Sequence, residues 1–198
     1  MIRIAINGFG RIGRNLFRLL LDHPTIEVVA INDIADTKTM AHLLKYDSIH
    51  GVLPFEVSYD EKGIIVDGKH FLFFHQKSIS NLDWKSTGID IVVESTGKHK
   101  TFEEINAHIL GGAKKVILSA PSEVEEIKTV VLGVNEHILD GTETIISNAS
   151  CTTNNAAPMM KVINKLCGIE QAYITTIHSY TTDQSLHDQP HKDLRRAR

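Results

Sequence analysis

Cysteine and long apolar runs are both scarce in this sequence. Only Cys151 and Cys167 occur among 198 residues, which is too few for a disulfide framework and suits a reducing compartment such as the cytoplasm. No apolar run approaches the roughly 20 residues that cross a bilayer. The first residues, MIRIAI, lack the charged and apolar regions of a signal peptide. We therefore expect a cytoplasmic protein with no membrane partner.

A basic excess is also missing. The formal net charge is -3, whereas nucleic-acid binders usually carry a clear excess of lysine and arginine. The 11 histidines are scattered, and neither CxxC nor HExxH spacing occurs. We therefore expect no nucleic-acid partner and no metal site. Hydrophobic residues make up 42% of the chain, which is enough for a packed core.

Apolar segments alternate with amphipathic ones along most of the chain. Short β-branched runs predict strands, and the segments with helical spacing between them predict helices. This alternation is typical of a parallel sheet with right-handed crossovers. Residues 55–74 alternate around turn signals and predict a hairpin excursion. The predicted strands are 2–6, 27–32, 89–94, 115–119, 129–133 and 144–147, and helices are predicted at 38–46 and 101–110.

The stretch IRIAINGFGRIG places Gly8, Gly10 and Gly13 in the GxGxxG spacing. It follows a strand, opens a helix and leads to a second strand that ends at Asp33, a combination that predicts a doubly wound Rossmann-type domain. Gly8 permits the tight turn, Gly10 leaves room for a pyrophosphate, and Gly13 lets helix and strand pack closely. The helix N-terminus favours the phosphate charge. Asp33 can accept hydrogen bonds from both adenine-ribose hydroxyls and would repel a 2′-phosphate, so we expect NAD rather than NADP.

Two further polar segments follow predicted strands. They are Ser95-Thr96-Gly97, after IDIVVE, and Ser119-Ala120-Pro121, after KKVILS. Ligands of open α/β sheets bind at the carboxyl ends of the strands, so both segments are candidates for the binding site. Polar residues are equally common at such positions as turn formers, and the sequence leaves these two explanations open.

Cys151 lies in SNASCTTNN, directly after the predicted strand at 144–147. A helix N-terminus and a nearby histidine both favour the thiolate, which is the nucleophilic form. If the helix begins near Pro158, which suits a first helical position, Cys151 lies in a loop. If the helix begins at Ser150, a good N-cap residue, Cys151 lies in its first turn and Pro158 kinks it. The sequence leaves both starts open.

His178 lies in the alternating run 172–180, which we expect to form a strand with Thr176 and His178 on one face. Alone, His178 is better explained as a structural histidine. Beside a dinucleotide site and Cys151, it becomes a candidate general base. Cys167 has no such surroundings, and we expect it to lie in the core.

Five segments carry a resemblance to a known family. NGFGRIGRN, AHLLKYDSIHG, SNASCTTN, HSYT and PHKDLRRAR resemble the phosphorylating, NAD-dependent glyceraldehyde-3-phosphate dehydrogenases, over the whole length from Met1 to Arg198. The resemblance implies the glycolytic oxidation and phosphorylation of glyceraldehyde 3-phosphate by a homotetramer, with inorganic phosphate as co-substrate. It implies that the Cys151 thiolate attacks the aldehyde, that His178 acts as base while hydride passes to NAD, and that phosphate cleaves the resulting thioester.

The same resemblance assigns the remaining site residues. Arg11 and Ile12 approach the pyrophosphate, and Asp33 holds the adenosine ribose. The residues expected to hold NAD are Gly8, Gly10, Arg11, Ile12, Asp33, Lys77 and Ser119, and those expected to bind phosphate groups are Ser150, Thr152, Thr181 and Arg198.

Chains of this family continue beyond Arg198. We therefore expect residues 1–150 to form the dinucleotide-binding domain, 151–198 to begin an α+β catalytic domain, and this N-terminal fragment to bind NAD with little or no turnover. One alternative is erythrose-4-phosphate dehydrogenase, which shares several of these motifs but lacks the HSYT run at 178–181. A different class of alternative is a non-catalytic nucleotide-binding module.

Overall fold

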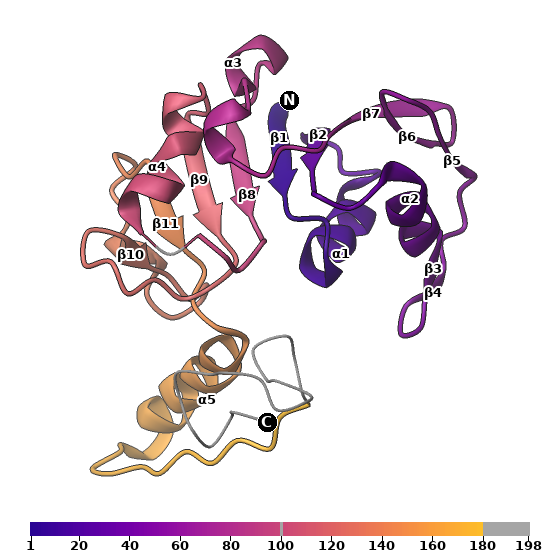
Figure 1. Ribbon diagram of the computed structural model, residues 1–198. Helices are drawn as coiled ribbons and strands as arrows, with labels where there is room; N and C mark the ends of the chain where they lie inside the picture. Colours follow the sequence, from indigo (N-terminus) through magenta and orange to yellow (C-terminus); the bar gives the residue numbers. More distant parts are fainter. Residues whose placement is uncertain (100, 180–198) are drawn as a thin grey trace, which may run out of the picture. The chain divides into compact units, whose positions relative to one another are not determined.

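The computed structural model describes residues 1–99 and 101–179 (Figure 1). The chain divides into two compact units, Met1–Lys161 and Val162–Arg198. Within the described residues, the first unit holds a nine-stranded sheet and a separate hairpin of β3 (Tyr46–Asp47) and β4 (Gly51–Val52). No helix in the described ranges is long and apolar enough to cross a membrane.

The large sheet has the order β10-β11-β9-β8-β1-β2-β7-β6-β5. Because β1 pairs in parallel with both β2 and β8, the strand order reverses at β1. This is the predicted doubly wound α/β arrangement, in which ligands bind at the carboxyl edge where the order reverses. The strands are β1 (Ile2–Asn7), β2 (Ile26–Asn32), β5 (Val57–Tyr59), β6 (Gly63–Val66), β7 (Lys69–Phe74), β8 (Ile91–Glu94), β9 (Lys115–Leu118), β10 (Lys128–Thr129) and β11 (Ile145–Ser147).

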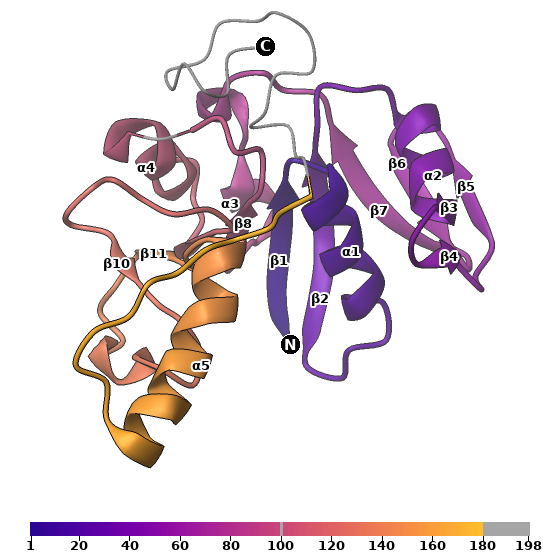
Figure 2. The ribbon, with the colours of Figure 1, turned by 90° about the horizontal axis from the view of Figure 1, so that it is seen from below.

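Helices cover both faces of this sheet. One core cluster joins the sheet to α1 and α2 and contains Phe17 and Leu44, while the other joins it to α3 and α4 and contains Trp84 and Ile105. Figure 2 shows α1 running alongside β1 and β2. The helices of the first unit are α1 (Arg11–Leu20), α2 (Thr37–Lys45), α3 (Trp84–Thr87), α4 (Phe102–Leu110) and the start of α5 (Cys151–Cys167), with short 3-10 turns η1 (Ile79–Asn81) and η2 (Glu136–Ile138).

The pairing of β1 with β2 contains a one-residue bulge. The register shifts after Ile4, so that Val29 of β2 is an extra residue. As a result, Val29 and Ala30 both pack towards the cluster beneath α4, although they are neighbours in the sequence. The shift also brings Asn7 opposite Asn32 at the carboxyl ends of the two strands.

The hairpin predicted at 55–74 forms β5, β6 and β7, and it is part of the large sheet rather than an excursion from it. β6 is antiparallel to β7, but β7 pairs in parallel with β2. The strand predicted at 129–133 is shorter than expected, because only Lys128–Thr129 pairs with β11.

Helix α5 begins at Cys151 and contains Pro158 in its interior. The start at Ser150 is therefore the correct one of the two that the sequence left open. Ser150 Oγ accepts a hydrogen bond from Thr153 N at 3.0 Å, which caps the helix. Pro158 removes one intrahelical hydrogen bond, and α5 nevertheless continues beyond it to Cys167.

Two predictions for the end of the chain are wrong. The described residues of the run 172–180 have no regular structure, because within 1–99 and 101–179 no strand supplies partners for their backbone hydrogen bonds. Cys167 is exposed rather than in the core, since no residue of α5 is buried.

Candidate functional site

The glycine loop, residues 8–13, joins β1 to α1 at the carboxyl edge of the sheet. Gly8 has a φ of +93°, and a Cβ added there would lie 2.6 Å from Thr96 N. A Cβ added at Gly13 would lie 2.2 Å from Gly8 O. At Gly10, by contrast, a Cβ would meet no described atom within 4 Å. The loop is therefore packed against neighbouring backbone on one side and open on the other, which leaves room for a phosphate group.

Asp33 follows β2 and contacts this loop directly. Its Oδ2 accepts a hydrogen bond from Phe9 N at 2.7 Å, and its Oδ1 accepts one from Ala35 N at 3.0 Å. The side chain is half-buried, so part of the carboxylate is still accessible. The residue predicted to bind a ribose thus also fixes the shape of the glycine loop.

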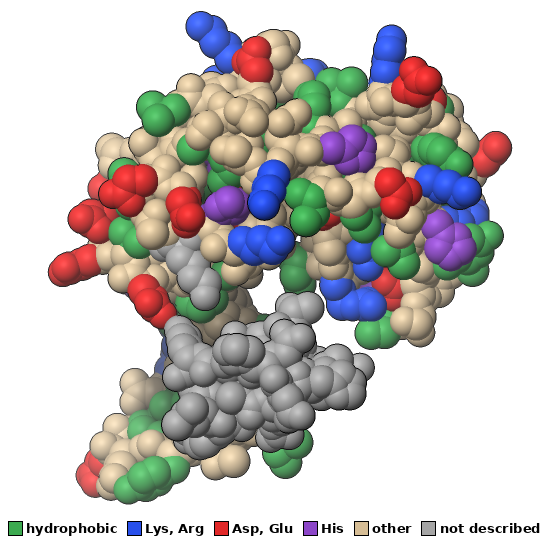
Figure 3. Space-filling model, viewed as in Figure 1, with side chains coloured by type: hydrophobic (Ala, Val, Ile, Leu, Met, Phe, Trp, Pro, Cys, Tyr) green, Lys and Arg blue, Asp and Glu red, His purple; other side chains and the backbone are tan. Residues whose placement is uncertain are grey.

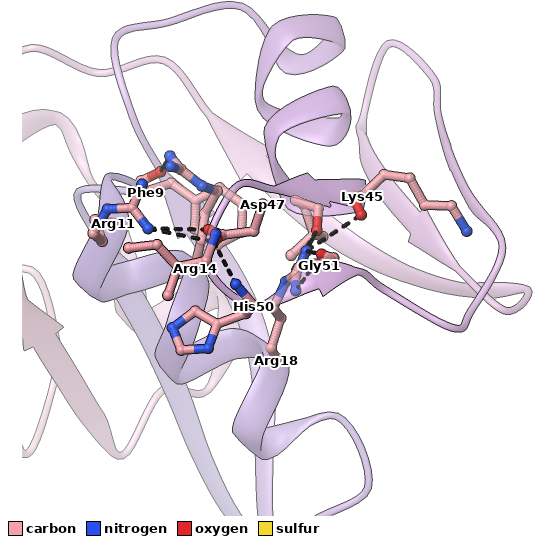
Figure 4. Close-up of polar contacts among 10 residues, drawn as sticks. Phe9, Arg11, Arg14, Arg18, Lys45, Asp47, His50 and Gly51 are labelled. Atoms are coloured by element: carbon pink, nitrogen blue, oxygen red, sulfur yellow. Dashed lines mark hydrogen bonds and ion pairs between the residues drawn. The ribbon is translucent and has the colours of Figure 1, made fainter.

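Arginines of α1 lie beside the loop, as Figure 4 shows. Figure 3 shows lysine and arginine side chains, in blue, on this face of the first unit. Arg11 Nη1 lies 3.2 Å from Asp47 Oδ2, and Arg14 Nη1 donates to Phe9 O at 2.8 Å. Backbone N–H groups of His50 and Ile49, together with Arg11, lower the pKa of Asp47 to about 2. Asp47 is therefore charged and holds Arg11 near the first turn of α1.

Ile12 is 55% exposed in the same first turn. Arg11 and Ile12, which are predicted from the sequence to approach a pyrophosphate, both lie in this first turn of α1. Gly10 is the N-cap of α1 and makes no side-chain capping bond, so the first amides of the helix are available to an anion.

The other strand ends lie along the same edge. Ser95 Oγ donates to Gly8 O at 2.7 Å, and Ser119 N donates to Glu94 O at 3.0 Å. Lys77 is exposed in the connection that follows β7. A hollow at the ends of β8 and β9 is lined by Glu94, Gly97, His99, Ile105, Leu118, Ala120, Pro121 and Ser122.

A buried polar network underlies the glycine loop. Glu94, the last residue of β8, is 3% exposed. Its Oε2 accepts hydrogen bonds from Asn7 Nδ2 and from His108 Nε2, and its Oε1 accepts from Thr96 N at 2.8 Å and from the Thr96 hydroxyl. Burial opposes ionisation of Glu94, but the hydrogen bonds from His108, Thr96 and Asn7 outweigh it and lower the pKa of the carboxyl.

The network continues on both sides of Glu94. Trp84 Nε1 donates to His108 Nδ1 at 2.9 Å, so Nδ1 carries no proton and His108 is neutral with its hydrogen on Nε2. On the other side, Asn32 Nδ2 donates to Asn7 Oδ1 at 2.7 Å. Asn32 also exchanges two hydrogen bonds with the backbone of Gln76, next to Lys77.

Cys151 follows a sharp turn between β11 and α5. Ala149 has a φ of +57°, a left-handed conformation that costs a non-glycine residue about 1 kcal/mol or more. Asn154 Nδ2 holds this turn by donating to Asn148 O at 2.6 Å and to Ser150 O at 3.0 Å. Cys151 is consequently the first helical residue, and it is exposed, as a nucleophile requires.

The remaining predicted site residues are divided between described and undescribed parts of the chain. Thr152 is half-buried in the first turn of α5. His178 is exposed in the second unit, with Nδ1 2.5 Å from Ser179 O, whereas Cys151 belongs to the first. Thr181 and Arg198 lie outside the described residues.

A doubly wound parallel sheet, a glycine loop at the strand where the order reverses, and a carboxylate after the second strand define a dinucleotide-binding domain. Residues 2–102 match the NAD binding domain of glyceraldehyde 3-phosphate dehydrogenase, and residues 150–198 match its C-terminal domain. The chain belongs to the glyceraldehyde 3-phosphate dehydrogenase family, and NAD is the cofactor of its first domain.

Curated relatives match this chain from end to end. It is 54% identical to the glyceraldehyde-3-phosphate dehydrogenase of Thermotoga maritima, covering 60% of that protein. It is 52% identical to the enzyme of the same name from Geobacillus stearothermophilus and 50% identical to glyceraldehyde-3-phosphate dehydrogenase 1 of Bacillus subtilis, covering 59% of each. The chain thus spans about 60% of the length of these relatives, and the resemblance seen in the sequence is confirmed.

Sequence reasoning did not find Asn7, Asn32 and Glu94. A signal was present, because each is the polar residue that closes a mostly apolar strand, in IRIAIN, EVVAIN and IVVE. The carboxyl ends of parallel strands lie at the same edge of a sheet, so three such endings indicate polar residues gathered there.

Proposed function

We propose that the whole protein is a phosphorylating glyceraldehyde-3-phosphate dehydrogenase of glycolysis, which forms 1,3-bisphosphoglycerate. The observation that carries this proposal is the placement of Cys151. It is an exposed thiol at the first position of a capped helix, in a chain whose first domain binds NAD. The macrodipole of α5 favours the thiolate at this end of the helix.

The Cys151 sulfur adds to the aldehyde carbon of the substrate and forms a carbon–sulfur bond. His178 takes the proton from the hydroxyl of this adduct. When bound, NAD would supply the oxidising power as the acceptor of a hydride from the substrate carbon. Inorganic phosphate then attacks the thioester carbon, and the Cys151 thiolate leaves as the acyl phosphate forms.

The residues of the first unit fit NAD. The open space at Gly10 and the uncapped first turn of α1 suit a pyrophosphate, and Arg11 adds a positive charge there. Asp33 presents a carboxylate for ribose hydroxyls. Exposed Lys77 and half-buried Ser119 lie after strands of the same edge, where the rest of the cofactor would contact them.

Ser150 and Thr152 flank Cys151, and each offers a hydroxyl group to a substrate phosphate or to the attacking phosphate. The backbone N–H of Thr152 lies in the first turn of α5, where helix amides favour an anion. Thr181 and Arg198 are the other phosphate ligands that we propose within this chain. The proposal includes a homotetramer in the cytoplasm, which rests on the family alone.

The test follows NADH absorbance with the whole protein, glyceraldehyde 3-phosphate and NAD. Without phosphate, we expect a burst of about one NADH per Cys151, because the thioester accumulates, and steady turnover only when phosphate is added. Cys151→Ser should abolish the burst, and Cys167→Ser serves as the matched control that retains it. A faster reaction with erythrose 4-phosphate, or a burst that survives Cys151→Ser, would contradict the proposal.

A further inference from the structure

Glu94 lies beneath the junction of two segments that meet at the proposed cofactor site: the glycine loop and the turn 95–97. We propose that Glu94 is a positioning residue that holds these segments in the arrangement that accepts NAD, and that Trp84 senses this arrangement through His108. The inference rests on the proposed NAD site and adds to it a residue that does not itself touch the cofactor.

The two segments are in direct contact. Ser95 N donates to Asn7 O at 2.7 Å, and Ser95 Oγ donates to Gly8 O at 2.7 Å. The space beside Gly8 is so narrow that a Cβ would lie 2.6 Å from Thr96 N. A small displacement of either segment would therefore change the space into which a dinucleotide fits.

Glu94 binds both segments with one carboxylate. Through Oε2 it accepts from Asn7, at the start of the glycine loop, and through Oε1 it accepts from the backbone and hydroxyl of Thr96. A charged carboxylate has enough lone pairs for all these donors and carries no donor of its own. Glutamine would direct its NH₂ group at one of the two donor pairs, so it would lose the contact with one segment.

The network links this junction to the single tryptophan of the chain. His108 Nε2 donates to Glu94 at 3.2 Å, and His108 Nδ1 accepts from Trp84 Nε1 at 2.9 Å. Trp84 is fully buried, which isolates its N–H from solvent. A change in the position of Glu94 is thus transmitted through one imidazole ring to one indole N–H.

If Glu94 had a purely structural role, Glu94→Gln would lower stability without changing the affinity for NAD. Asp90 provides the matched control. Asp90 is a carboxylate at the opposite end of the same strand region, where it accepts from Arg3 N at 2.9 Å and from Lys114 Nζ at 2.6 Å. Asp90→Asn should lower stability without altering the carboxyl edge. Glu94→Gln should lower stability and also reduce the fraction of molecules in the competent arrangement, which weakens binding in proportion.

The experiment measures NAD binding by calorimetry and the Trp84 indole N–H resonance by NMR, in the whole protein. We expect Glu94→Gln to raise the dissociation constant for NAD about tenfold, which corresponds to a tenth of the molecules in the competent arrangement. Asp90→Asn should leave it unchanged. Without NAD, the indole resonance of Glu94→Gln should differ from that of the wild type, and saturation with NAD should move it towards the wild-type position. The resonance of Asp90→Asn should stay close to that of the wild type with and without NAD.

Unchanged NAD affinity in Glu94→Gln would overturn the inference, and so would an indole resonance in that variant that coincides with the wild-type position before NAD is added. If Glu94→Gln does not fold, Thr96→Val is the second variant, because it removes the hydroxyl donor to Glu94 Oε1 and should change the affinity and the resonance in the same directions. Failure of the proposed cofactor site is a separate result, since calorimetry on the wild type would then show no NAD binding at all.

Discussion

Asp33 Oδ2 accepts a hydrogen bond from Phe9 N at 2.7 Å, which ties the middle of the glycine loop to the end of β2. One carboxylate therefore shapes the glycine loop and is also the group that we propose to bind the ribose. These two tasks are separated by the use of different lone pairs on the same group.

Asp33→Asn should weaken NAD binding about tenfold and bring the affinities for NAD and NADP closer together. The amide has one acceptor oxygen in place of two, and it no longer repels a 2′-phosphate; one hydrogen bond to a charged group is worth roughly 1.5–3 kcal/mol. Calorimetry with both dinucleotides measures the ratio. Asp36→Asn, which removes the N-cap carboxylate of α2, is the control that should leave the ratio unchanged.

Arg11→Gln should weaken NAD binding several-fold at low ionic strength and by less at high salt, because the exposed guanidinium acts on the pyrophosphate through screened charge. Titrations at two salt concentrations test this. Arg3→Gln is the control, since Arg3 pairs with Glu27 at 3.4 Å at the opposite edge of the sheet. An equal loss of affinity at both salt concentrations would argue against an electrostatic role for Arg11.

Iodoacetamide should alkylate Cys151 at least about tenfold faster than Cys167. Both thiols are exposed, but they lie at opposite ends of α5, where the helix dipole has opposite effects on a thiolate. Mass spectrometry of the two cysteine peptides over time gives both rates from one sample. Similar rates would remove the physical basis for Cys151 as an activated nucleophile.

Ser150→Ala should lower the free energy of unfolding by about 1 kcal/mol, because the first turn of α5 loses its cap. It should also slow the alkylation of Cys151, which depends on an ordered helix N-terminus. Ser150→Asn keeps a capping oxygen and should restore both quantities. Urea unfolding and the alkylation assay report them independently, and a loss of stability that asparagine does not restore would speak against the cap.

Acid should destabilise the connection between β10 and β11. Hydrogen bonds from Lys128 Nζ and from the backbone of Asp140 lower the pKa of Glu143 from 4.5 to about 2. A lowered pKa in the folded state contributes stability above the unfolded value, and this contribution is lost as the pH falls from about 4.5 towards 2. Urea midpoints across this window should fall less in Glu143→Gln than in the wild type; parallel curves would contradict this.

The parts of the fold that could be predicted are those that a short local stretch of sequence determines. The spacing of Gly8, Gly10 and Gly13, and the position of Asp33 after the second strand, are set by the geometry of one βαβ unit, so a short stretch of sequence contains the whole constraint. The start of α5 was harder, because Ser150 and Pro158 gave opposite signals and only the turn at Ala149 decides between them.

What could not be predicted depends on partners distant in the sequence. The alternating pattern of the run 172–180 can form a strand only if another strand pairs with it. The burial of Cys167 requires an element that covers its face of α5. Likewise, the contact of Glu94 with Asn7 joins residues 87 positions apart. Each local sequence shows a polar residue at a strand end, but neither specifies the partner of that residue.

The bulge at Val29 separates the two ends of the β1–β2 pair, and the register of the strands is fixed less strictly at one end than at the other. At the amino ends, Arg3 lies opposite Glu27 and pairs with it on the surface, where an ion pair fixes register only weakly. At the carboxyl ends, the buried pairing of Asn7 with Asn32 fixes the register. Because the extra residue lies between these two ends, the register of the asparagine pair is offset by one residue from that of the Arg3–Glu27 pair.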